Sequence, residues 1–149
     1  NDPVAVAHAI QRSCAIKAEI VAQDEKEQSV RALLNFGHTF GHAIEKLTGY
    51  GNWTHGDAVA VGMVLAARLS ENMSLITPED VQDIEEILTA ANLPISLPSI
   101  DPTELLTAMK SDKKAKDRNI QLVLLKNIGE AFLTADYPKE DLVNLLRAS

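Results

Sequence analysis

Residues 56–72 are small or apolar at nearly every position, and this segment constrains the fold more than any other part of the chain. A helix at the surface of a globular protein has one apolar face, whereas a helix that is apolar on all sides has to be surrounded by other elements. The segment has only 17 residues and carries Asp57 and Arg68 near its ends, which excludes a membrane span. We therefore expect a central, buried helix.

Helix-capping signals predict further helices around this one. Asp2 followed by Pro3 is a typical helix start. A capping residue followed by a proline also occurs at Thr77 and at Asp101, in both cases with acids in the first turn. Apolar residues also repeat at helical spacing from Val30 up to Gly49, which is typical of a helix end. The predicted helices span about residues 3–23, 30–49, 78–91, 102–111 and 137–147.

Only residues 120–125 and 130–133 have the composition of paired strands, with a turn at 127–129 between them. The expected fold class is therefore all-α, a mainly helical bundle with one small β-hairpin. A chain of 149 residues with 46% apolar content is long enough to bury one core, so we expect a single domain over residues 1–149.

Composition excludes several classes of partner. A formal net charge of -7 argues against a nucleic-acid or anionic-membrane surface, since such partners require a concentrated basic face. The single cysteine, Cys14, excludes an internal disulfide, and the cytoplasm is the expected compartment. The chain starts at Asn1 with neither a methionine nor a signal peptide, so we expect a fragment of a longer protein.

Three of the four histidines, His38, His42 and His55, lie within 18 residues. His38 and His42 share one helix face at i, i+4 spacing, and a turn at residues 49–51 can bring His55 back toward them. A catalytic zinc ion takes about three protein ligands and keeps one open position. The spacing fits a metal or catalytic site and equally fits capping or core histidines that bond backbone carbonyls for purely structural reasons.

The roles within this cluster also have alternatives. Pairing His38 with His42 resembles helical zinc motifs, but the residues between them lack the glutamate base of metallopeptidases, which disfavours a peptidase. Pairing His38 with His55 leaves His42 for proton transfer or substrate contact.

A polar stripe is predicted on the helix that carries the first two histidines. Arg31, Asn35, His38 and His42 follow one another at i, i+4, i+7 and i+11. Polar side chains at such positions indicate a helix face that lines a cavity, and an ordinary solvated face is the alternative.

Two long motifs then indicate a family. Residues 31–45 read RALLNFGHTFGHAIE and residues 49–63 read GYGNWTHGDAVAVGM, with Lys113 and Lys114 ahead of the hairpin. This pattern resembles the C-terminal domain of 3-dehydroquinate synthases over essentially the whole chain. The resemblance implies an all-helical C-terminal domain of the dehydroquinate synthase-like fold, without the N-terminal domain that binds NAD.

The resemblance also implies an activity. Enzymes of this family are carbon–oxygen lyases of the shikimate pathway, which leads to aromatic amino acids. They convert the sugar phosphate 3-deoxy-D-arabino-heptulosonate 7-phosphate to 3-dehydroquinate and phosphate, using bound NAD and a divalent metal, usually zinc. We expect the isolated chain to be inactive, because NAD is bound mainly by the absent domain.

By position, His38 and His55 match the metal ligands of the family, and the third ligand, a glutamate, would precede Asn1. His42 matches a histidine near the substrate phosphate and the path of proton transfer. Other polar residues of the substrate pocket are matched by Lys17, Glu27, Arg31, Asn35 and one of Lys113 and Lys114. A substrate with a carboxylate and a phosphate needs such cationic donors, although lysines near a helix end can also have a purely structural role.

Two other functions remain open. The first alternative is a stand-alone, non-catalytic module that binds a metal or an anion. The second is a domain of another sugar-phosphate cyclase or of a related metal-dependent alcohol dehydrogenase. Apolar surface left by a missing domain would favour a homodimer.

Overall fold

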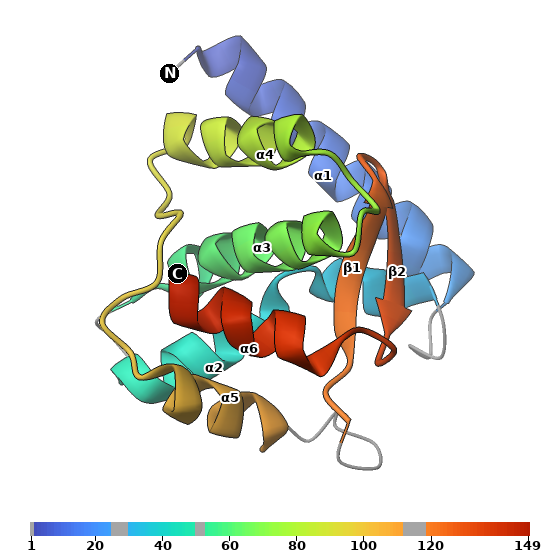
Figure 1. The fold of residues 1–149 in the computed structure, drawn as a ribbon. Coiled ribbons are helices and arrows are strands. Elements are labelled where there is room, and N and C mark those ends of the chain that lie inside the picture. The colour runs from blue at the N-terminus through green and yellow to red at the C-terminus, as the bar shows by residue number, and fades with distance from the viewer. Residues whose placement is uncertain (1, 25–29, 50–52, 112–118) are drawn as a thin grey trace. The chain divides into compact units, whose positions relative to one another are not determined.

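The computed structural model describes residues 2–24, 30–49, 53–111 and 119–149 of the chain. The chain forms two compact units, Asn1–Asn35 and Phe36–Ser149. The first unit contains helix α1 (Pro3–Gln23) and the short 3-10 helix η1 (Val30–Asn35) (Figure 1).

Helix α1 begins where the capping signal predicts. The Asp2 carboxylate accepts a hydrogen bond from the backbone nitrogen of Val4 at 2.9 Å, and Pro3 takes the first helical position. At the other end, the carboxylate of Asp24 accepts a hydrogen bond from the backbone nitrogen of Arg31 at 3.0 Å. This bond connects the end of α1 to η1 within the first unit.

The second unit is built around one helix. Its elements are α2 (His38–Thr48), α3 (His55–Asn72), α4 (Pro78–Ala90), α5 (Pro102–Lys110), β1 (Leu122–Asn127), β2 (Glu130–Thr134) and α6 (Lys139–Ala148). Helix α3 contacts α2, α4, α6 and β1 (Figure 1), and more than half of its residues are buried. The predictions of a central buried helix and of a mainly helical fold with one small hairpin are confirmed.

A side-chain cap followed by a proline marks the start of α4 and of α5. The Thr77 side chain accepts a hydrogen bond from the backbone of Asp80, and the Asp80 carboxylate accepts one from the backbone of Thr77. At the start of α5, hydrogen bonds from the backbone nitrogens of Glu104 and Thr103 lower the pKa of the Asp101 carboxyl. Both helix starts were predicted from the sequence.

The hairpin is held to the central helix by a buried polar contact. The Ser70 hydroxyl of α3 donates to the backbone oxygen of Ala66 at 2.8 Å and accepts from the backbone nitrogen of Leu125 at 3.0 Å. The strands turn at residues 128–129, where Gly129 has a φ of +89°. The first strand begins two residues later than predicted, at Leu122.

One predicted helix is wrong. Instead of a continuous helix over 30–49, η1 ends at Asn35 and α2 begins at His38, with Gly37 between them at a φ of +79°. Arg31 and Asn35 therefore lie on a different helix from His38, and the predicted polar stripe at i, i+4, i+7 and i+11 does not form. Such a φ is open to glycine at little steric cost.

The reason for this break is the close approach of α3. A Cβ atom on Gly37 would lie 2.7 Å from the backbone oxygen of Val59 and 2.7 Å from the backbone nitrogen of Met63. A Cβ atom on Gly62 would lie 2.0 Å from the carbonyl oxygen of Gly37, and one on Gly41 would lie 3.1 Å from the Cα of Val59. Gly37, Gly41 and Gly62 thus let the backbones of α2 and α3 approach closely. Among the described helices, none is long and apolar enough to cross a membrane.

We predict that Gly62→Ala lowers the free energy of unfolding by about 1–3 kcal/mol, because the added methyl would overlap the Gly37 carbonyl. Urea denaturation followed by circular dichroism measures this change. Gly56→Ala is the matched control, since its Cβ would meet only the Thr54 hydroxyl at 3.8 Å on the same helix. Equal stability of the two variants would contradict the close contact.

We also predict a loss of stability in alkali. The Tyr137 hydroxyl donates to the backbone oxygen of Ile120 at 2.9 Å, and burial raises the pKa of Tyr137 to about 12. Because the unfolded tyrosine ionises near pH 10, its contribution is complete below that pH and is lost as the pH rises toward 12. Melting temperatures between pH 8 and 12 should fall more steeply for the wild type than for Tyr137→Phe; parallel curves would contradict this.

Candidate metal centre

Three histidine side chains meet between the first turns of α2 and α3. His38 is the first residue of α2, His42 follows one turn later, and His55 is the first residue of α3. The ring centroids are 5.2 Å apart for His38 and His55, 5.6 Å for His38 and His42, and 5.9 Å for His42 and His55. The convergence predicted from the spacing is confirmed.

One local and one long-range set of hydrogen bonds hold the two helix starts in place. At the start of α3, the Thr54 hydroxyl donates to the Asp57 carboxylate at 2.6 Å and accepts from the Asp57 backbone nitrogen at 3.1 Å. At the start of α2, the Thr39 hydroxyl donates to the backbone oxygen of Gln121 at 3.2 Å, just before β1. His55 therefore lies on a capped helix start, and His38 lies next to a residue that is hydrogen-bonded to the segment before β1.

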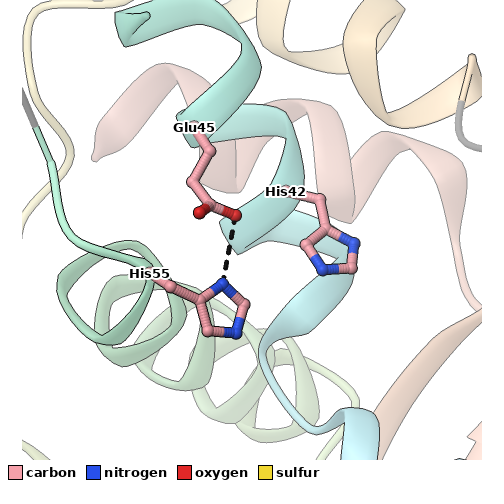
Figure 2. Close-up of side chains that lie close together, drawn as sticks. All are labelled: His42, Glu45 and His55. Carbon is pink, nitrogen blue, oxygen red and sulfur yellow. Dashed lines mark hydrogen bonds and ion pairs between the residues drawn. The ribbon is translucent and has the colours of Figure 1, made fainter. Parts of the chain in front are cut away.

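The ring nitrogens of two histidines have acceptors at hydrogen-bond distance. His38 Nδ1 lies 3.2 Å from the backbone oxygen of Phe36, and His55 Nδ1 lies 3.2 Å from Glu45 Oε2 (Figure 2). A carbonyl or carboxylate oxygen only accepts, so we assign the proton of each neutral ring to Nδ1. Each Nε2 then carries the lone pair that a metal ion needs, which is the usual arrangement of metal-binding histidines.

The distance between these two rings fits a shared metal ion. Two imidazoles bound to one tetrahedral zinc at about 2.0–2.1 Å have ring centroids about 5 Å apart. His38 and His55 form the pair closest to this value, at 5.2 Å. The residues present therefore fit a divalent ion held by these two nitrogens.

A second grouping of ligands is also present. His42, Glu45 and His55 each offer one ligand atom, and these atoms all lie within 4.8 Å of one another (Figure 2). His42 is exposed, whereas the Glu45 side chain is only 16% exposed. The two groupings share His55. In the first, Glu45 is a hydrogen-bond acceptor for His55, and in the second it is itself a metal ligand.

Glu45 is the residue that sequence reasoning missed. It appears in the sequence analysis only as the last residue of the motif RALLNFGHTFGHAIE, with no role assigned to it. The available signal was its spacing, since Glu45 follows His42 by three residues and His38 by seven on α2, which places all three on one face.

The predicted substrate residues that the structure describes belong to the first unit, whereas the histidines belong to the second. Lys17 is an exposed residue of α1, while Arg31 and Asn35 belong to η1, all in the first unit. The Asn35 side-chain nitrogen donates to the backbone oxygen of Ala32 at 3.2 Å. Three further predicted residues lie outside the described residues: Glu27, Lys113 and Lys114. Their roles stay predictions.

A family model decides what this chain is related to. The model described as "3-dehydroquinate synthase C-terminal" matches residues 1–115. The chain belongs to the 3-dehydroquinate synthase C-terminal family. It is 52% identical over 143 residues to a 3-dehydroquinate synthase of Psychrobacter arcticus and 54% identical over 140 residues to one of Acinetobacter baumannii. These alignments cover 96% and 94% of this chain but only 37% and 39% of the relatives.

Solved structures of two synthases have the same fold. A 2-epi-5-epi-valiolone synthase from Streptomyces hygroscopicus, with NAD+ and Zn2+ bound, matches 99% of this chain and 41% of its own at a TM-score of 0.84 and 23% identity. A 2-deoxy-scyllo-inosose synthase, complexed with carbaglucose-6-phosphate, NAD+ and Co2+, matches 91% of this chain and 40% of its own at a TM-score of 0.74 and 27% identity. The predicted fold of dehydroquinate synthase-like proteins is confirmed.

Proposed function

We propose that this chain is the metal- and substrate-binding part of a 3-dehydroquinate synthase, active when joined to an NAD-binding domain. The reaction is the conversion of 3-deoxy-D-arabino-heptulosonate 7-phosphate to 3-dehydroquinate and phosphate in the shikimate pathway. The observation that carries this proposal is the pair His38 and His55, whose rings are 5.2 Å apart and whose Nδ1 atoms each lie 3.2 Å from an acceptor.

In this proposal His38 and His55 hold a divalent ion such as zinc through Nε2, and a third ligand comes from outside this chain. When bound, the ion supplies Lewis acidity to substrate hydroxyls and NAD supplies a reversible hydride acceptor. Both histidines sit at helix N-termini, where partial positive charge favours an anionic substrate.

We assign His42 a different task from that of the metal pair. Its ring is exposed and lies 5.6 Å from that of His38. We assign to it the movement of a proton beside the substrate phosphate, which suits an imidazole near neutral pH. The substrate carboxylate and phosphate would be bound by the predicted donors Lys17, Arg31, Asn35 and one of Lys113 and Lys114, while Glu27 would be a further polar residue of the pocket.

The surface of α1 supports a role for a further domain. The helix has no buried residue, and Val4 and Ile10 are 76% and 60% exposed. Exposed apolar side chains of this kind are typical of a surface that contacts another part of a protein. The NAD+ in the two cyclase structures and the 37–39% coverage of the relatives agree with a partner domain that binds NAD. A homodimer stays a prediction.

One observation favours a second candidate, a stand-alone module that binds a metal without catalysis. His42, Glu45 and His55 would supply three ligands from this chain alone. We prefer the synthase because it also accounts for the family match over residues 1–115.

We predict that His38→Ala and His55→Ala each abolish zinc binding by the chain, because each removes one of only two proposed local ligands, while His42→Ala leaves most of it. Isothermal titration calorimetry with zinc measures the affinity, and His8→Ala, an exposed residue of α1, is the matched control. Loss of binding in His42→Ala but not in His38→Ala would favour the stand-alone module.

We further predict that the 149-residue chain releases no phosphate from 3-deoxy-D-arabino-heptulosonate 7-phosphate when NAD and zinc are supplied, because the NAD-binding domain would be lacking. A colorimetric phosphate assay measures the rate, with the Acinetobacter baumannii synthase as positive control. Release above the rate without protein would show that the chain needs no further domain.

A further inference from the structure

We propose that Glu45 is a positioning residue for the metal centre, whose carboxylate keeps the proton of His55 on Nδ1 and directs Nε2 toward the ion. The inference rests on the proposed function in one respect, namely that His38 and His55 bind the metal. In this inference Glu45 contacts a ligand histidine and does not itself bind the ion.

The geometry joins two helices. Glu45 lies on α2 and His55 begins α3, yet Glu45 Oε2 is 3.2 Å from His55 Nδ1 (Figure 2). The Glu45 side chain is 16% exposed and that of His55 is 55% exposed. The mostly buried carboxylate can therefore orient the more exposed ring.

An exposed imidazole needs such an acceptor. A ring that is free to change tautomer and rotamer loses that freedom when it binds a metal, and this loss weakens binding. An acceptor at Nδ1 removes part of the cost in advance and makes Nε2 a better donor to the metal. For His38 the Phe36 carbonyl, 3.2 Å from Nδ1, has the same function.

Direct binding of the metal by Glu45 is the competing role. His55 Nδ1 is the ring atom next to the carboxylate, so an ion shared by Glu45 and His55 would take Nδ1. The two roles therefore demand opposite states of one atom, since Nδ1 carries a proton in the first and a metal ion in the second.

The first test is nitrogen-15 NMR of the metal-free 149-residue chain, at a pH where the imidazoles are neutral. We expect His55 to carry its proton on Nδ1 in the wild type and in Glu45→Gln, whose amide oxygen still accepts, and to lose this preference in Glu45→Ala. A wild-type His55 without a proton on Nδ1, or a Glu45→Ala variant with an unchanged tautomer, would overturn the inference.

The second test is titration with zinc. Loss of a carboxylate next to a ligand histidine typically lowers metal affinity about 10–100-fold. We expect this loss in Glu45→Ala, affinity within a few-fold of wild type in Glu45→Gln, and none of it in Glu19→Ala, an exposed residue of α1 that controls for charge. Equal losses in Glu45→Ala and Glu45→Gln would show that Glu45 is a ligand and overturn the inference.

The two tests separate this inference from the proposed function. Melting temperatures of the metal-free variants identify any loss that comes from folding. If His38→Ala leaves zinc binding unchanged while His55 keeps its Glu45-dependent tautomer, the proposed ligand pair is wrong and the Glu45–His55 pairing is still supported.

Discussion

The backbone contact between α2 and α3 determines where the histidines of this protein lie. The carbonyl of Gly37 fills the place where Gly62 would carry a Cβ atom, at 2.0 Å from that position. His38 directly follows Gly37, and His55 begins the helix that Gly62 belongs to. Metal sites tolerate deviations of only about 0.2 Å in ligand distances, so a methyl group that separated the helices would move the two rings out of range.

The rest of the second unit keeps that contact in place. The side chains of α3 are small or apolar at nearly every position, which lets α2, α4, α6 and β1 pack around this helix. The buried Ser70 hydroxyl links α3 to β1, and Thr39 links α2 to the residue before β1. The histidines thus stand on packed helices rather than on long loops, which gives their positions the precision that a ligand site requires.

Sequence patterns were reliable where the signal is local. The caps Asp2, Thr77 and Asp101 predicted helix starts, because a side-chain oxygen and the backbone nitrogens that it binds lie within three residues. The helix over 30–49 was wrong because its apolar spacing continues through Gly37, and spacing does not encode a φ of +79°. Only the approach of Val59 and Met63 from α3 explains that turn.

The sequence by itself determined the chemistry of the site: three imidazoles, their spacing on helices, and motifs specific enough to indicate the family. The tertiary structure decided how close those imidazoles lie and which acceptor the Nδ1 atom of His55 meets. Glu45 and His55 are ten residues apart on different helices, and their contact depends on how closely α2 and α3 pack. That distance is set by the absence of side chains at Gly37, Gly41 and Gly62, whose effect appears only when the two backbones meet.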